Sequence, residues 1–127
     1  MKTVLIVTDG SAGTAEIAAG IEKALKGNNV TVKAAPEFKG NDILPAEVFF
    51  LGCEKPDPES FTYLENVLKH INLAGRRCGV FSPGCKKSSK YLAGLLKDCE
   101  AALNPEHYTG SGKDAGKWAK GVVSGSY

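Results

Sequence analysis

Short apolar runs alternate with helical patterns along this chain of 127 residues. Val4–Val7 and Val48–Leu51 are continuous apolar runs, which is typical of strands buried on both faces of a parallel sheet. Arg77–Phe81 predicts another strand. Val30–Ala34 alternates between apolar and polar residues and predicts a more exposed strand at a sheet edge. Ala101–Tyr108 predicts a fifth strand that a proline interrupts.

Helical patterns fill the intervals between these runs. Ile17, Ile21 and Leu25 recur every four residues and predict a helix that Gly27 ends as its C′ residue. A second helix is expected to begin with Asp57 as N-cap and Pro58 in its first turn, after an irregular stretch over residues 36–45. The apolar positions of the remaining helical faces are Phe61, Leu64, Leu68 and Ile71; Leu92, Leu95, Leu96 and Cys99; and Trp118, Ala119 and Val122 in a closing helix from Lys113 to Val123.

Strands that alternate with helices predict right-handed βαβ units, and therefore an α/β fold with a parallel sheet between two layers of helices. In such sheets, ligands bind at the carboxyl ends of the strands, where the strand order reverses. Three loops are expected to meet at that edge: the first loop (Asp9–Thr14), the second loop (Gly52–Pro58) and the third loop (Ser82–Ser89). Function is expected in these three loops.

Composition narrows the class of protein. The net charge of +2 is too small to favour nucleic acid, and no apolar stretch approaches the length of a membrane span. The N-terminus has no signal-peptide layout, so we expect a cytoplasmic protein of one domain, residues 1–127, with a loose tail at 124–127. The four cysteines show no CxxC or zinc spacing and are expected to be reduced; a redox pair of Cys53 and Cys85 needs Cα atoms within about 7 Å.

The stretch LIVTDGSAGTAEIAAGI resembles the flavodoxin signature, and FFLGC and RRCGVFSPG resemble the strands and loops that follow it in that family. The positions that match the signature are Leu5, Ile6, Ala12, Thr14, Ala18 and Ile21. The resemblance implies a flavodoxin-like three-layer sandwich with a five-stranded parallel sheet in the order 2-1-3-4-5. It also implies non-covalent FMN, and an electron carrier that docks transiently on redox partner proteins without substrate chemistry of its own.

The first loop has features that suit the FMN phosphate. Backbone N–H groups and the dipole at a helix start attract anions, and Ser11 and Thr14 supply hydroxyl donors. The ring is expected between the second and third loops. The expected FMN-binding residues are Asp9, Gly10, Ser11, Ala12, Gly13 and Thr14 in the first loop, Gly52, Cys53, Glu54 and Lys55 in the second, and Ser82, Pro83, Gly84, Cys85 and Lys86 in the third.

The chain departs from the family pattern at several positions. Asp9 stands where the signature has a hydroxyl, Val7 replaces an aromatic residue, and the flavin loops lack the usual Trp and Tyr rings. Three readings of Asp9 follow. A phosphate binds beside it at an electrostatic cost, or Asp9 caps the helix in place of a ligand, or Asp9 turns away and accepts N–H groups from a neighbouring loop, so that the phosphate still binds. The alternative function is therefore a flavodoxin-fold domain without cofactor, acting as a binding or regulatory module.

Other classes lack their defining residues. A response-regulator receiver needs an acceptor aspartate after the third strand, where this chain has Gly52 and Cys53, and a dinucleotide site needs GxGxxG after the first strand. No Ser-His-Asp or metal-binding pattern is visible. Two lysines of the third loop, Lys86 and Lys87, either raise the potential of a bound flavin or form a patch that docks an acidic partner.

Overall fold

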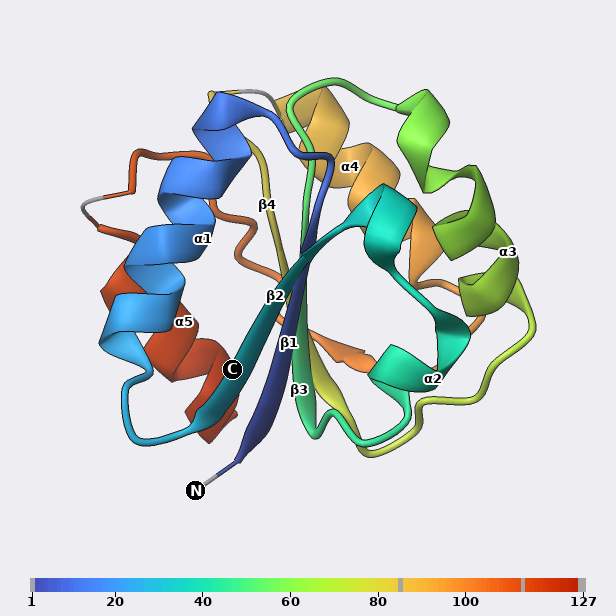
Figure 1. The fold of residues 1–127 in the computed structure, drawn as a ribbon, viewed down its shortest axis with the longest axis horizontal. Coiled ribbons are helices and arrows are strands. Elements are labelled where there is room, and N and C mark those ends of the chain that lie inside the picture. Colours follow the sequence, from blue (N-terminus) through green and yellow to red (C-terminus); the bar gives the residue numbers. More distant parts are fainter. Residues whose placement is uncertain (1, 85, 113, 126–127) are drawn as a thin grey trace.

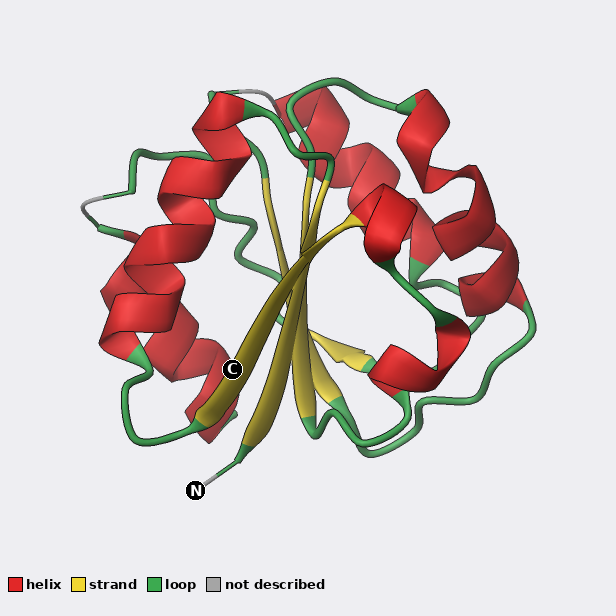
Figure 2. Cartoon of the chain, viewed as in Figure 1, coloured by secondary structure: helices red, strands yellow, loops and turns green. Residues whose placement is uncertain are grey.

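The computed structural model describes residues 2–84, 86–112 and 114–125 (Figures 1 and 2). Helices and strands alternate along the chain. Their bounds are β1 Thr3–Thr8, α1 Ala12–Ala24, β2 Asn29–Ala34, the 3-10 helix η1 Ala35–Glu37, α2 Gly40–Ile43, β3 Val48–Gly52, the 3-10 helix η2 Glu59–Phe61, α3 Thr62–Lys69, β4 Arg77–Phe81, α4 Lys86–Leu95, β5 Ala102–Leu103 and α5 Ala115–Ser124.

All strand pairs are parallel, and the strand order is β2-β1-β3-β4-β5. Figure 1 shows α1 and α5 on one face of the sheet and α3 and α4 on the other. The predicted three-layer α/β sandwich and its strand order are therefore confirmed. The chain goes from β1 to β2 on one side of it, and all later strands lie on the other side. The strand order therefore reverses between β1 and β3, and the carboxyl ends of these two strands adjoin that point.

The two faces of the sheet have separate cores. Along β1, Val4 and Ile6 pack with α1 and α5, whereas Leu5 and Val7 pack with α3 and α4. This alternation follows from the two-residue period of a strand, and both faces are apolar because helices cover both. The continuous apolar runs of the sequence therefore predicted the central strands correctly.

Several predicted boundaries are wrong. Asp57 is not an N-cap: its φ of 51° is left-handed, and η2 and then α3 begin after Pro58. The stretch over residues 36–45, predicted as irregular, carries η1 and α2. Lys86 is the first residue of α4, so the third loop ends before it. Each error arises at a short element or a helix start, where few residues carry the pattern.

The fifth strand is shorter than predicted. β5 comprises only Ala102–Leu103, and after Pro105 the chain returns to β4 in an isolated bridge between Phe81 and Tyr108. The C-cap of α1 is Leu25, so the C′ residue is Lys26 and not Gly27 as predicted; Gly27, with a φ of 97°, follows one residue later. The predicted closing helix is present as α5; Lys113, its predicted start, lies outside the described residues.

We expect amide hydrogen exchange to be slowest at Val4–Val7, Val48–Leu51 and Cys78–Phe81, because these segments pair on both sides and are covered on both faces. The edge strand β2 is more exposed and is expected to exchange faster. Exchange mass spectrometry or NMR measures this. Protection of β2 equal to that of β1, with β3 unprotected, would contradict the strand order.

Candidate functional site

The three loops meet at the carboxyl edge of the sheet, as expected. The Asp9 N–H donates to the carbonyl of Gly52 at 3.1 Å, which joins the first loop to the second. The hydroxyl of Ser88, in the first turn of α4, donates to the carbonyl of Glu54 at 3.1 Å. Gly13 touches the third loop, because a Cβ placed there would lie 2.9 Å from Cγ of Pro83.

The Asp9 carboxylate is the centre of the first loop. Its Oδ1 accepts hydrogen bonds from the Ser11 N–H at 3.0 Å, the Ser11 hydroxyl at 2.7 Å and the Thr14 hydroxyl at 2.8 Å. Its Oδ2 accepts from the N–H of Glu54 in the second loop at 2.9 Å. Asp9 therefore takes the hydroxyl donors that the sequence assigned to a phosphate, and it also accepts from a neighbouring loop.

Asp9 is not the helix cap in the strict sense. The N-cap of α1 is Ser11, whose hydroxyl accepts a long hydrogen bond of 3.4 Å from the N–H of Thr14. Asp9 lies two residues before this N-cap, outside the helix, and accepts hydrogen bonds from the N–H and the hydroxyl of Ser11. Asp9 thus accepts an N–H from a neighbouring loop, as the third reading expected, but it does not turn away from the first loop, whose hydroxyls it engages in place of a ligand.

Hydrogen bonding keeps the Asp9 carboxyl ionised. Burial alone would raise its pKa, but the bonds from the Glu54 N–H, the Ser11 hydroxyl and N–H and the Thr14 hydroxyl outweigh burial and hold the pKa below its ordinary value. A carboxylate that accepts several hydrogen bonds in this way is an anion fixed at the start of α1, where the helix dipole also favours negative charge.

A second carboxylate borders the same helix start. Oε1 of Glu54 lies 3.6 Å from the position that a Cβ on Gly13 would occupy. Gly13 belongs to the first turn of α1, so Glu54 contributes its backbone N–H to Asp9 and its side chain to the edge of the helix N-terminus. The sequence pattern did not reveal this, because Glu54 stands 45 residues from Asp9.

These residues do not fit the phosphate of FMN in the arrangement observed. The hydroxyls of Ser11 and Thr14 are engaged by Asp9, and Thr14 is fully buried. At about 4 Å and an effective dielectric of about 20, each pair of like unit charges costs about 4 kcal/mol, and a phosphate dianion here would face both Asp9 and Glu54. The carboxylates therefore oppose a ligand phosphate at the start of α1.

Two tyrosines of the helices after the second and third loops, Tyr63 in α3 and Tyr91 in α4, have partners within the core. Tyr63 packs on Phe38 with ring centroids 6.0 Å apart, and its hydroxyl accepts the N–H of Gly40 at 3.0 Å. Tyr91 packs against the core on the α3 and α4 side of the sheet. These contacts hold Tyr63 away from the three loops. The Tyr91 hydroxyl, in contrast, is buried close enough to Asp57 and Cys53 of the second loop that burial and the nearby charges raise its pKa.

The remaining predicted site residues have varied surroundings. One glycine in the first loop and one in the third have left-handed backbone conformations, with φ of 82° at Gly10 and 61° at Gly84. Cys53 and Ser82 are fully buried, and the Ser82 hydroxyl has no hydrogen-bond partner within the described part of the chain. Ala12, Lys55 and Lys86 are exposed. Cys85 lies outside the described residues, and with it the proposed Cys53–Cys85 pair.

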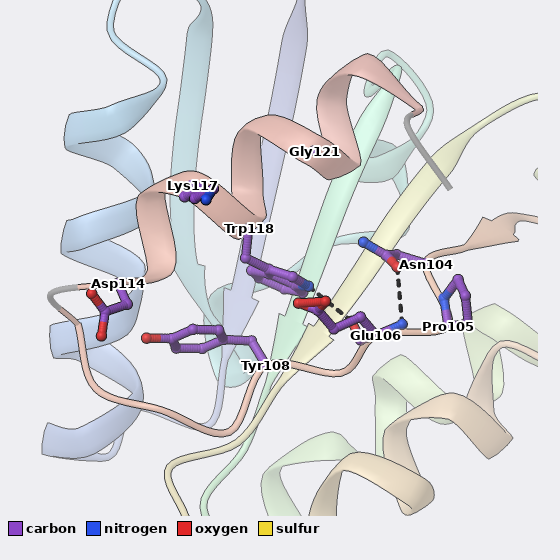
Figure 3. A pocket seen from close by; sticks show the side chains of 8 residues that line it. All are labelled: Asn104, Pro105, Glu106, Tyr108, Asp114, Lys117, Trp118 and Gly121. Atoms are coloured by element: carbon purple, nitrogen blue, oxygen red, sulfur yellow. Dashed lines mark hydrogen bonds between the residues drawn. The ribbon is translucent and has the colours of Figure 1, made fainter.

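A hollow of about 650 Å³ lies between α5 and the segment that follows β5 (Figure 3). In Figure 3 the rings of Tyr108 and Trp118 lie close together, and the Trp118 N–H donates to the carbonyl of Glu106 at 2.8 Å. The lining residues are Asn104, Pro105, Glu106, Tyr108, Asp114, Lys117, Trp118 and Gly121. None of them belongs to the predicted flavin loops.

Several solved structures that resemble this chain are flavodoxins. A short-chain flavodoxin associated with a PDU bacterial microcompartment has a TM-score of 0.85 at 16% identity, with 98% of each chain covered. A flavodoxin of Streptococcus pneumonia TIGR4 has a TM-score of 0.83 at 17% identity, over 97% of this chain and 98% of the other. Fusobacterium nucleatum flavodoxin bound to flavin mononucleotide has a TM-score of 0.76 at 16% identity, over 98% and 99%.

No protein-family model and no curated protein matches the sequence. The structural likeness extends over nearly the whole chain, and it shows that this protein is a flavodoxin-like domain. Within the described part of the chain, none of the helices combines the length and the hydrophobicity that crossing a bilayer requires.

Proposed function

We propose that this protein is a flavodoxin-fold binding module in which its own carboxylates stand where a cofactor phosphate would be held, and that it acts by binding a partner rather than by carrying electrons on FMN. The observation that carries the proposal is the set of hydrogen bonds to Asp9, which uses the hydroxyls of Ser11 and Thr14 and the N–H of Glu54. The second carboxylate, on Glu54, supports it.

The docking face would be the carboxyl edge of the sheet with the first turns of α4. Lys86, Lys87 and Lys90 are exposed there. On the second loop, exposed Glu54 and Asp57 flank Lys55, so the positive charge is concentrated at the start of α4. Exposed lysines affect the association of two proteins mainly by long-range electrostatic attraction, which speeds the encounter and orients the partner. This distribution favours an acidic partner protein that docks transiently.

FMN-dependent electron transfer is the second candidate function. The flavodoxin-like fold favours it, because one structure that resembles this chain over nearly its whole length is a flavodoxin bound to FMN. In that case redox proteins would be the partners. Binding would require the Ser11 and Thr14 hydroxyls to leave Asp9, and the helix start would then have to hold a phosphate beside that carboxylate.

Flavin titration distinguishes the two functions. We expect the purified full chain to be colourless and to show no preference for FMN over riboflavin, because the chain's own carboxylates oppose the phosphate. Asp9→Ser removes one of these charges and restores a hydroxyl. This variant is expected to gain affinity for FMN over riboflavin by about tenfold or more, which corresponds to about 1.4 kcal/mol. Flavin fluorescence quenching and calorimetry measure both affinities.

A charge-matched control is Glu22→Gln, which removes a carboxylate from the exposed last turns of the same helix, α1. It should leave flavin binding as in the wild type. A yellow protein purified with stoichiometric FMN, or a wild type that binds FMN more tightly than riboflavin, would overturn the cofactor-free proposal and establish the second candidate.

A further inference from the structure

A second hollow, of about 230 Å³, lies between the start of α4 and the segment that follows β5. Lys86, Ser89 and Lys90 line it from α4, and Pro105, His107 and Thr109 line it from the other side. The lining residues are two lysines, a histidine, a serine, a threonine and a proline, and most of the lining surface is carbon. No carboxylate is among these described lining residues, so the hollow has a positive character.

Hydrogen bonds hold its two walls together. The N–H of Gly84 donates to the carbonyl of Thr109 at 2.9 Å, and the N–H of Ser82 donates to the carbonyl of Tyr108 at 2.8 Å. Across the hollow, Nδ1 of His107 lies 3.2 Å from the hydroxyl oxygen of Ser89. The site is therefore built from two segments whose spacing the backbone fixes, in contrast to a patch of independent surface lysines.

Ser89 belongs to both walls. Its hydroxyl donates to the carbonyl of Lys86 at 2.9 Å within α4, and its oxygen is the atom that faces Nδ1 of His107. Ser89 therefore ties the start of α4 to the segment after β5.

We infer that this hollow binds a phosphate group, as the free ion or as a small phosphate monoester. The two lysines match the charge of a dianion, and the ring of His107 and the hydroxyl of Thr109 are further polar groups of the lining. Lys86 is the first residue of α4, so the positive end of that helix adds to the field. The inference goes beyond the proposed function, because none of these residues contacts Asp9 in the bonds described above and the hollow does not depend on whether flavin binds.

The test is an NMR titration of the full chain with inorganic phosphate at fixed pH and ionic strength. We expect saturable shifts of the His107 ring resonances and the Thr109 amide. Phenyl phosphate in a second arm distinguishes a monoester site from one that takes only the free ion, and tighter binding of phenyl phosphate assigns the site to monoesters. Acetate is the control anion and should shift these resonances at least tenfold less at equal concentration.

Variants locate the binding. Lys86→Met with Lys90→Met should weaken phosphate binding by tenfold or more, whereas Lys87→Met, on the same turn but outside the hollow, should change it less than twofold. All three lysines are exposed, so their replacement should leave the fold intact. Shifts that do not saturate, that acetate reproduces, or that Lys87→Met reduces as much as the double variant, would overturn the inference. None of these outcomes bears on the flavin titration.

Discussion

Asp9→Ala is expected to lower the free energy of unfolding by about 2–4 kcal/mol. The substitution leaves four donors without their acceptor: the Ser11 N–H and hydroxyl, the Thr14 hydroxyl and the Glu54 N–H. A hydrogen bond to a charged group contributes about 1.5–3 kcal/mol, but water can replace the acceptor at the more exposed donors, so the loss is well below the sum. Thr14 is fully buried, and its hydroxyl has a second acceptor in reach, the carbonyl of Ser11 at 3.0 Å, which limits the loss further. Urea unfolding followed by circular dichroism measures it.

The contribution of Asp9 should also depend on pH. Its pKa in the folded protein lies below the ordinary value of 3.8, so the carboxylate stabilises the fold above about pH 4, and this stabilisation is lost as the pH falls through the folded-state pKa. The stability difference between wild type and Asp9→Ala should therefore shrink at acidic pH. The pKa of Asp42 is also lowered, chiefly by the Lys39 N–H, but both proteins contain Asp42 and its effect cancels.

Two results would contradict this account of Asp9. A loss below about 0.5 kcal/mol, the usual range for surface substitutions, would mean that the carboxylate is not held by the loop. A stability difference that stays constant from neutral to strongly acidic pH would mean that the pKa of Asp9 is not lowered in the folded state. Glu22→Gln is again the matched control and should show neither effect.

Trp118→Ala is expected to have the largest effect on stability, a loss of about 3–5 kcal/mol. Trp118 is 7% exposed and packs against Phe50, Phe81 and Tyr108 with centroid distances of 5.5, 6.4 and 5.4 Å. It fills space that β4 leaves open at Gly79, where a Cβ would lie 2.7 Å from the indole. The substitution therefore leaves a cavity between α5 and the sheet.

Two further variants separate packing from hydrogen bonding at Trp118. Trp118→Phe keeps most of the ring but loses the N–H that donates to Glu106, and it should cost about 1–2 kcal/mol. Leu44→Ala, at a position that is 52% exposed, should cost less than about 0.5 kcal/mol. A loss for Trp118→Ala no greater than that of Leu44→Ala would show that α5 does not seal this face of the sheet.

The central strands were predictable because their signal is local. A strand covered on both faces must be apolar at every position, and Val4–Val7 and Val48–Leu51 satisfy this condition without reference to any other residue. The length of the final strand was overestimated because its pairing depends on residues elsewhere in the chain. Beyond Leu103, pairing with β4 resumes only at Tyr108. Within residues 101–108, Pro105 alone indicates this interruption, and the pattern of apolar residues does not.

The state of Asp9 could not be derived from the sequence. The three readings differ only in which donors reach the carboxylate, and one donor, the Glu54 N–H, comes from a loop 45 residues away. The carboxyl edge of a parallel sheet places these loops together, but the pattern of residues does not say which groups pair. The same limit applies to the hollow between Lys86 and His107, whose residues are separated by a helix and a strand.

The sequence by itself determined the α/β class, the central strands and the three loops at which function was sought, because hydrophobic periodicity and chain connectivity specify these. Only the tertiary structure decided that Asp9 and Glu54 share the helix start and that Lys86, Lys90 and His107 line one hollow. The physical reason is that hydrogen bonds and charge pairs act over a few ångströms between residues far apart in the chain, and that proximity exists only once the sheet has brought the loops together.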